Sequence, residues 1–287
     1  MYGIKSINGI DDIVKEVGVS VCRLAAIDLD GTLLASDLTL SGRSRAALDA
    51  ARGAGIETVF VTARHLAALD HYPDLALVGE AVCCLGAAVH EFPSGRLTWA
   101  RSIDPRTVAE VAVRIKREFP GLELAWVPES GPLGYEPAYS RPPLLGESYR
   151  GSPEEIGQPV LKLFAVGPEL GRERPEFLLD ALAGQVEIAH FGDGFVDLVA
   201  PGVGKVDTLR GLCERRGIRA DEVAAFGDTA ADIDMIRWAG HGVFMANGAP
   251  ELRHHADEIA PDCDADGVAV VLERLVSERL AAESVRG

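Results

Sequence analysis

The feature that most constrains this chain is a short apolar run that ends in two closely spaced acids. Residues 24–27 (LAAI) have the character of a buried β-strand, and Asp28-Leu29-Asp30-Gly31-Thr32 follows at once. Side chains alternate along a strand, so the carboxylates of Asp28 and Asp30 are expected to point to the same side. Gly31 allows a sharp turn and a close approach of backbone N–H groups to a ligand.

Two carboxylates are costly to hold together unless a cation or a shared proton relieves their repulsion. The pair therefore suits a nucleophilic carboxylate that works beside a second, acid/base carboxylate on a phosphate ester. The same residues are equally compatible with a strand followed by an ordinary Asp-Gly turn. The rest of the chain distinguishes these two interpretations.

Both ends of the chain alternate between strand and helix, which predicts an α/β fold with a doubly wound, mostly parallel, Rossmann-like sheet. Further strands are expected at 56–61, 223–226 and 242–245, and a third apolar run covers 82–89. Helices are expected at 44–54, 206–216, 231–238, 250–255 and 267–280.

The middle of the chain has a different character. It contains predicted strands at 97–103, 122–127, 160–166, 186–189 and 195–200, with helices at 107–119 and 173–182. Residues 131–159 are rich in Pro, Gly and Ser and are expected to be irregular. We therefore predict a core domain formed by 1–90 and 201–287, with 1–20 as an N-terminal extension and 91–200 as an inserted α+β domain.

Composition excludes several classes of function. The formal net charge of -16 leaves no cationic field for nucleic acid or an anionic membrane. No stretch of 18 apolar residues predicts a membrane span, and the N-terminus does not resemble a signal peptide. The five scattered cysteines lack metal-ligand spacing and suit reduced thiols, so we expect a cytoplasmic protein whose partner is a small molecule.

Polar groups follow the other predicted strands, where ligands of open α/β sheets bind. Thr62 follows the strand at 56–61; its hydroxyl could bind a phosphoryl oxygen or cap a helix. Lys205 begins a helix, where the helix dipole disfavours a cation, although a solvated lysine is the ordinary alternative. Asp228 and Asp232 are four residues apart and could converge on Mg²⁺, although acids in a first turn also cap helices.

Four segments, in this order, resemble the haloacid dehalogenase-like (HAD) phosphohydrolase superfamily: AIDLDGTLL at 26–34, VTAR at 61–64, PGVGK at 201–205 and FGDTAADIDMI at 226–236. The segments 242–257 and 264–272 resemble the Cof-type branch (subfamily IIB). In that branch a large α/β cap, of the C2 type, is inserted between the second and third motifs. The resemblance covers nearly the whole chain from about residue 22.

The resemblance implies a role for each motif residue. Asp28 would be the nucleophile that forms an aspartyl-phosphate, and Asp30 would protonate the leaving group and then activate water. Thr62 and Lys205 would bind the oxygens of the transferring phosphoryl group, which suits a reaction catalysed by positioning and charge neutralisation.

The resemblance also implies a metal site. Asp228, with Asp232 nearby, would bind Mg²⁺ together with Asp28 and the backbone carbonyl of Asp30. The implied function is a Mg²⁺-dependent phosphatase for a small phosphorylated metabolite, with a sugar phosphate as the expected class. A phosphomutase of the same superfamily and a weakened phosphometabolite-binding or regulatory protein are the alternatives.

Two positions depart from the family pattern. Ala231 stands where the family usually has Asn, and Leu85 stands in a segment where Asn-Gly-Ala is common. Each departure removes a polar group near the expected site, which could reduce Mg²⁺ affinity or turnover. Possible substrate contacts in the cap, each also explicable as an ordinary surface or strand residue, are Arg101, Arg141, Arg150, Lys162 and His190.

Overall fold

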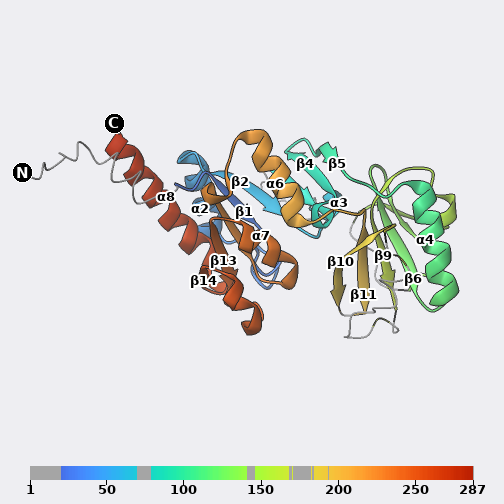
Figure 1. The fold of residues 1–287 in the computed structure, drawn as a ribbon. Coiled ribbons are helices and arrows are strands. Elements are labelled where there is room, and N and C mark those ends of the chain that lie inside the picture. The colour runs from blue at the N-terminus through green and yellow to red at the C-terminus, as the bar shows by residue number, and fades with distance from the viewer. Residues whose placement is uncertain are drawn as a thin grey trace, which may run out of the picture.

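The computed structural model describes residues 21–69, 79–140, 146–167, 170, 182, 184–192 and 194–286. The chain forms two α/β parts, a core domain built on an eight-stranded sheet and a smaller cap built on a six-stranded sheet (Figure 1). The predicted fold class is confirmed. The expected N-terminal extension and all but Leu182 of the helix expected at 173–182 lie outside the described residues.

The core sheet has the strand order β14-β13-β12-β1-β2-β3-β4-β5. Its first six strands run parallel, and β4 and β5 extend the sheet in antiparallel fashion. The strands are β1 Leu24–Ile27, β2 Glu57–Val61, β3 Gly79–Cys83, β4 Ala88–Phe92, β5 Arg96–Ala100, β12 Val223–Gly227, β13 His241–Met245 and β14 Glu258–Ala260.

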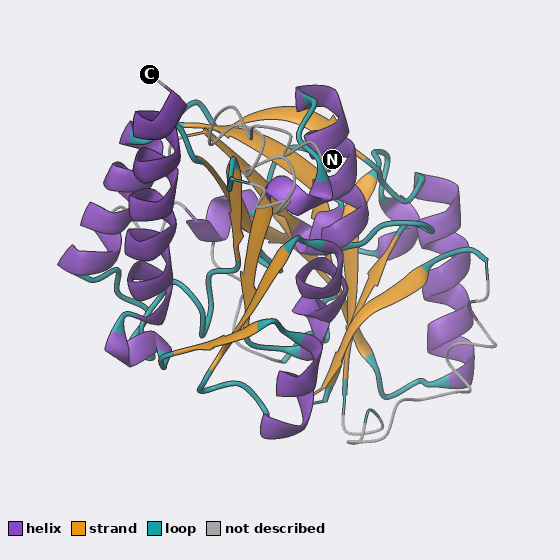
Figure 2. Cartoon of the chain, turned by 60° about the vertical axis from the view of Figure 1, so that its left-hand side comes forward, coloured by secondary structure: helices purple, strands orange, loops and turns teal. Residues whose placement is uncertain are grey.

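Helices cover both faces of this sheet (Figure 2), which explains why β1 is apolar at every position. Ala25 and Ile27 belong to the apolar cluster that includes α2 and α8. Leu24 and Ala26 point the other way, into the cluster that includes α6 and α7. The helices are α2 Gly42–Gly53, α6 Lys205–Arg216, α7 Ile233–Trp238 and α8 Gly267–Arg286, with the short α3 at Leu66–Leu69.

The structure corrects the predicted domain boundary. The third apolar run is two strands, β3 and β4, separated by a 3-10 turn at Cys84–Gly86. Within this turn Cys84 (φ 52°), Leu85 (φ 58°) and Gly86 (φ 108°) all have a positive φ, which is unusual for the first two residue types. The boundary expected at residue 90 therefore falls inside β4, and the first core segment extends through β5.

The cap sheet has the order β10-β11-β9-β6-β7-β8. One of its faces packs against α4, Pro105–Glu118, whose first turn is capped by the Asp104 side chain. The segment expected to be irregular contains two short strands, because Gly134 and Tyr135 of β7 pair with the buried strand β6 and β8 pairs with β7. The cap strands are β6 Glu123–Pro128, β7 Leu133–Tyr135, β8 Ser148–Arg150, β9 Val160–Val166, β10 Glu187–Gly192 and β11 Phe195–Val199.

Three smaller expectations, on helix type, on the cysteines and on membrane spans, can be compared with the structure. The segment at 250–255 is a 3-10 helix rather than an α-helix, and a 3-10 turn at Ala230–Asp232 precedes α7. The five cysteines are free thiols, and all but Cys22 are buried. In the part of the chain that the structure describes, no helix combines the length and the apolar character that a membrane span requires.

Packing in the cap predicts that alanine substitutions at two glycines will have very different effects on stability. Trp126 is fully buried and pairs with Gly134 across β6 and β7, where an added Cβ would overlap the indole ring. We expect Gly134→Ala to lower the free energy of unfolding by about 1–3 kcal/mol, because an overpacked core forces the ring to move. Urea titration followed by tryptophan fluorescence measures the change.

Gly157→Ala is the matched control, because Gly157 has open space where its Cβ would be. Its unfolding free energy is expected to stay within about 0.5 kcal/mol of the wild type. Equal effects of the two substitutions would contradict the packing described for Trp126.

Candidate active site

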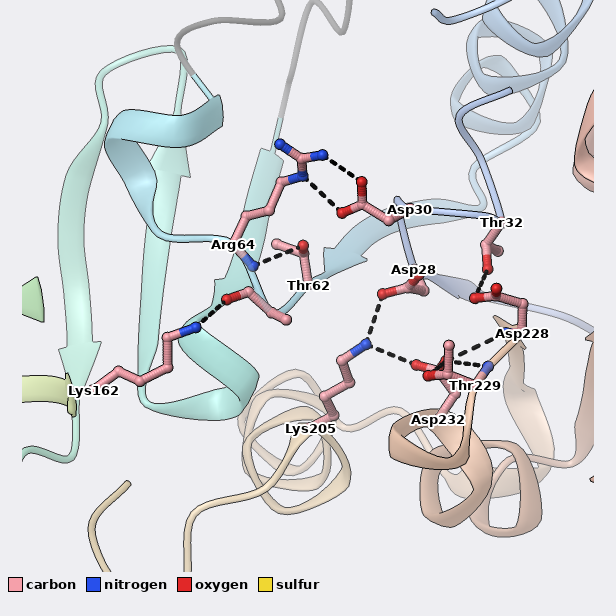
Figure 3. A network of polar contacts seen from close by, with 11 residues as sticks. Asp28, Asp30, Thr32, Thr62, Arg64, Lys162, Lys205, Asp228, Thr229 and Asp232 are labelled. Atoms are coloured by element: carbon pink, nitrogen blue, oxygen red, sulfur yellow. Dashed lines mark hydrogen bonds and ion pairs between the residues drawn. The ribbon is translucent and has the colours of Figure 1, made fainter. Parts of the chain in front are cut away.

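The sheet register brings the predicted site residues to one edge. Ile27 pairs with Phe60 on one side and with Phe226 on the other. The chain segments that follow these three strands therefore leave the sheet at the same edge. Asp28, Thr62 and Asp228 are in these segments, and Figure 3 shows their side chains gathered around Lys205.

Lys205 occupies the centre of the site. Its Nζ lies 2.6 Å from Asp28 Oδ1 and 2.7 Å from Asp232 Oδ1 (Figure 3). The three side chains are almost completely buried, with exposed fractions of 5%, 7% and 0% for Lys205, Asp28 and Asp232. Burial disfavours the ammonium charge, but the carboxylates of Asp232 and Asp28 hold the pKa of Lys205 above its usual value.

Glycines and a hydroxyl place Lys205 at this point. Gly86 has φ 108° and no room for a Cβ against the backbone of Gly204, so the turn after β3 packs directly on the start of α6. Thr208 Oγ1 donates a hydrogen bond of 2.6 Å to the Gly86 carbonyl and ties the same two segments together. The Lys205 side chain therefore points from the first residue of α6 toward the end of β1.

Asp232 organises the turn after β12. Its Oδ2 accepts hydrogen bonds from the backbone N–H of Asp228 (3.3 Å), the backbone N–H of Thr229 (3.0 Å) and the Thr229 hydroxyl (2.9 Å). Its Oδ1 accepts from Lys205. Both oxygens of Asp232 are thus engaged, which suits a residue that positions Lys205 and Asp228.

Three carboxylates share this small volume. Ligand oxygens of Asp28, Asp228 and Asp232 lie within 4.8 Å of one another. Burial, with the nearby charge of Asp232, raises the pKa of Asp28 to about 8 although Lys205 opposes the shift. Burial and the same charge raise the pKa of Asp228 to about 6, against the hydrogen bond from Thr32. A hard divalent cation would relieve this repulsion, and oxygen atoms of Asp28 and Asp228 are suitable ligands.

Asp30 and Arg64 form the second polar pair of the site. Arg64 Nε donates to Asp30 Oδ2 at 2.7 Å, and a second guanidinium nitrogen contacts Asp30 Oδ1. Asp30 is more accessible than Asp28, with 43% of its side chain exposed. The carboxylate of Asp30 is not in the acidic cluster, so its part in metal binding would be limited to the backbone carbonyl that the resemblance implies.

Thr62 lies beside these groups and is fully buried. Its Oγ1 accepts a hydrogen bond of 3.0 Å from the backbone N–H of Arg64, which stabilises the turn after β2. The hydroxyl acts as acceptor in this bond, so its own proton is not used there, and Thr62 itself does not line the cavity described below.

A cavity of about 610 Å³ separates this edge of the core from the cap sheet. Asp28, Asp30, Arg64 and Lys205 line the core side. Leu85 and Ala231, the two departures from the family pattern, also line it. The residues that line the cap side are Tyr139, Lys162, Phe164, Val166, His190, Phe195 and Asp197.

The sequence indicated the cap side only in part. Lys162 and His190 were possible contacts and do line the cavity, whereas Arg150 donates to carbonyls of the cap's own backbone. Arg101 lies beside Gly202, and Arg141 is outside the described residues. Phe164, Phe195 and Asp197 were not predicted. The sequence shows that these residues alternate with others along two strands, but it does not show which face of the cap sheet would lie toward the core domain.

Comparisons with known proteins agree with this arrangement. The chain matches the model of the haloacid dehalogenase-like hydrolase family over residues 25–272. It is 28% identical over 267 residues to the pyridoxal phosphate phosphatase YbhA of Escherichia coli, covering 86% of this chain and 96% of that protein. It is 26% identical over 294 residues to the phosphatase YwpJ of Bacillus subtilis, covering 88% and 100%.

Among solved structures, the chain is similar to the HAD subclass IIB sugar phosphatase BT4131, with a TM-score of 0.73 and 21% identity. That similarity covers 88% of this chain and 98% of the other. The shared fold therefore includes both the core domain and the cap.

The raised pKa of Asp28 predicts how stability depends on pH when no metal is bound. The carboxyl would lose its proton near pH 4 in the unfolded chain but retains it to about pH 8 in the folded protein. Stability should therefore fall as pH rises through this window, by up to about 1.4 kcal/mol per pH unit from this group. We expect Asp28→Asn to remove that part of the dependence, as measured by urea titrations with EDTA between pH 5 and pH 8.

Asp49→Asn is the control, because Asp49 lies on α2 with 64% of its side chain exposed. Its unfolding free energy should follow the wild-type pH dependence. Parallel curves for the wild type and Asp28→Asn would show that Asp28 ionises normally in the folded protein.

Proposed function

Because the chain belongs to the haloacid dehalogenase-like hydrolase family, we propose that it is a phosphatase of the Cof-type branch, which hydrolyses a small phosphorylated metabolite through an aspartyl-phosphate on Asp28, with Mg²⁺ as cofactor. The expected family is confirmed, and the shared fold with a subclass IIB structure supports the expected subfamily. The observation that carries the proposal is the buried contact of Lys205 with Asp28 at the floor of a cavity large enough for a metabolite.

Asp28 suits the role of nucleophile. Its Oδ1 is held by Lys205 and the side chain lines the cavity, so the carboxylate is fixed in orientation. Lys205 can also stabilise charge on the transferring phosphoryl group, and the Thr62 hydroxyl can donate to one of its oxygens. Bound Mg²⁺ would be held by Asp28 and Asp228 and would neutralise phosphoryl charge.

Asp30 suits the acid/base role. It lines the same cavity and is partly exposed, so it can reach the leaving-group oxygen and later a water molecule. While Arg64 holds both carboxylate oxygens, Asp30 can only accept hydrogen bonds. The anionic phosphate of a substrate would compete for Arg64, and its binding would release Asp30 to donate a proton.

The same residues bear on the alternative of a phosphometabolite-binding protein without catalysis. Retention of Asp28, Asp30, Lys205 and Asp228 in one site favours turnover over a binding protein without catalysis. Relatives and similar structures act on different phosphates, pyridoxal phosphate for one and a sugar phosphate for another, so they do not select the substrate class.

Removal of the nucleophile tests the mechanism. We expect Asp28→Asn to reduce phosphate release from p-nitrophenyl phosphate by more than about 1,000-fold, because a carboxamide cannot form the phosphoenzyme. EDTA should abolish wild-type activity and Mg²⁺ should restore it. Release of inorganic phosphate is measured with a coupled colorimetric assay.

Asp49→Asn, on the exposed surface of α2, should retain wild-type activity. In Asp30→Asn, which lacks the base for hydrolysis, rapid quenching and mass spectrometry should find phosphate on the peptide that contains Asp28. Wild-type turnover by Asp28→Asn would refute the aspartyl-phosphate mechanism.

The departure at Ala231 gives a gain-of-function prediction. Ala231 is half-buried and lines the cavity next to the turn that carries Asp228. We expect Ala231→Asn to lower by several-fold the Mg²⁺ concentration that gives half-maximal activity, because an amide can bind a metal-bound water or a phosphoryl oxygen. Steady-state activity is titrated with Mg²⁺.

Ala230→Asn is the matched control, since Ala230 is exposed and is not part of the cavity lining. It should leave the Mg²⁺ titration unchanged. The same titration curve for Ala231→Asn and the wild type would show that position 231 does not limit metal binding.

A further inference from the structure

A turn of the core domain takes one of its hydrogen bonds from the cap. The carbonyl oxygens of Thr62, Ala63 and Arg64, in the turn after β2, each accept a hydrogen bond. The first and the third accept from backbone N–H groups of the 3-10 turn after β3, at 3.1 and 2.9 Å. The carbonyl of Ala63 accepts from Lys162 Nζ of the cap at 2.8 Å (Figure 3). The cap therefore holds one peptide of a turn whose neighbouring peptides are held by the core.

The bond from Lys162 acts on the peptide unit that leads into Arg64. The Ala63 carbonyl and the Arg64 N–H belong to one planar unit, so neither can turn without the other. The N–H donates to Thr62 Oγ1 at 3.0 Å, which holds the unit at its other edge. From the same unit the Arg64 side chain reaches Asp30, where Nε donates to Oδ2 at 2.7 Å. The orientation of this peptide therefore constrains where the Arg64 guanidinium lies.

Contacts within the cap keep Lys162 in place. Strand β9 lies between β11 and β6, so the strand that carries Lys162 is fixed on both sides. The side chain is only 4% exposed, and its Nζ lies 3.5 Å from the Asp197 carboxylate and 4.3 Å from the centre of the Phe164 ring. Both contacts offset part of the cost of burying an ammonium group. The shortest of these contacts of Lys162 is nevertheless the one to the core, at Ala63.

A second cap lysine, Lys116, has the same kinds of partner but does not reach the core. Its Nζ donates to the Leu122 carbonyl at 2.7 Å and to the Glu136 carboxylate at 3.1 Å. All three residues belong to the cap, and none of them lines the cavity. Lys116 therefore stabilises the cap alone, whereas Lys162 joins a cap carboxylate to the turn that carries Arg64.

We propose that Lys162 is a positioning residue for the acid/base step. By holding the peptide that leads into Arg64, it fixes the guanidinium beside Asp30, where that group orients the carboxylate and meets the substrate phosphate. A hydrogen bond from an ammonium group is strong enough to hold a single peptide unit, and loss of alignment at Asp30 slows proton transfer to the leaving group. Lys162 itself contacts neither the phosphoryl group nor the leaving group. This role rests on the proposed phosphatase function and adds to it a residue from outside the motif segments.

Two phenyl esters that differ in the basicity of the leaving group test this role. Phenolate needs a proton from Asp30 as it leaves, whereas the weakly basic pentafluorophenolate, of similar shape, needs little help. The kcat/KM values for both esters are measured with Mg²⁺ for the wild type and for Lys162→Met, which keeps the length of the side chain but cannot donate. We expect kcat/KM for phenyl phosphate to fall by about tenfold or more, and the ratio of pentafluorophenyl to phenyl phosphate to rise by about fivefold or more.

A double variant keeps the test independent of a folding defect. Lys162→Met leaves Asp197 without its cation, so Lys162→Met/Asp197→Asn removes both charges and should show the same rise in the ratio. Lys116→Met/Glu136→Gln is the matched control, because it removes the equivalent lysine and carboxylate within the cap. That control should keep the wild-type ratio even where its unfolding free energy, measured by urea titration, is lower.

A double-mutant cycle with Arg64→Met identifies the group through which Lys162 acts. Once Arg64 is replaced, the further loss of Lys162 should change kcat/KM for phenyl phosphate by less than about twofold, because the two residues act in series. If Lys162 instead donates to the leaving-group oxygen itself, the two losses would multiply, which would overturn the proposed role.

Two further outcomes would contradict the role of Lys162 and leave the phosphatase function intact. An equal fall of kcat/KM for both esters in Lys162→Met would indicate a purely structural contribution. Wild-type values for both esters would show that the core holds the peptide without the lysine. Absence of wild-type turnover with both esters and with acetyl phosphate would overturn the phosphatase function, and this role with it.

Discussion

A buried ammonium group holds together the parts of the chain that form the active site. Lys205 contacts Asp28 at the end of β1 and Asp232 in the turn after β12, and it is itself the first residue of α6. Removal of one partner would leave an uncompensated buried charge, so each depends on the others. With Asp228, three carboxylates share one lysine. Burial, together with this excess of negative charge, raises the pKa values of Asp28 and Asp228, and the charge is what a divalent cation would neutralise.

Close backbone approach is the second condition for this site. Gly31 has no room for a Cβ beside the Asp228 carboxylate, and Gly227 has none beside Asp232. Both glycines come directly before or after motif acids, so the acids can converge only because their neighbours lack side chains. The motifs therefore encode the space around the charges as well as the charges themselves.

The sequence allowed much of the core to be predicted, because carboxyl ends of parallel strands share an edge. Asp28, Lys205 and Asp228 could be assigned to one place without knowledge of any contact. The domain boundary could not be predicted, since the reversal between β3 and β4 begins with Cys84 and Leu85 in left-handed conformations that are unusual for these residue types, and Gly86 is a single glycine inside an apolar run. Such conformations are stabilised by tertiary hydrogen bonds to the turn after β2, which appear only in the folded chain.

The two lysines of the cavity differ in what they hold in place. Lys205 Nζ donates short hydrogen bonds to two carboxylates. At most one of its three N–H donors is therefore left for a ligand. Lys162 bonds a backbone carbonyl of the core and lies 3.5 Å from the Asp197 carboxylate. In the proposed function every phosphate binds the same core groups, so selection among leaving groups would depend on the cap residues that line the cavity. Strand alternation lets single substitutions there alter the face toward the cavity while the buried core of the cap, on the opposite face, keeps its packing.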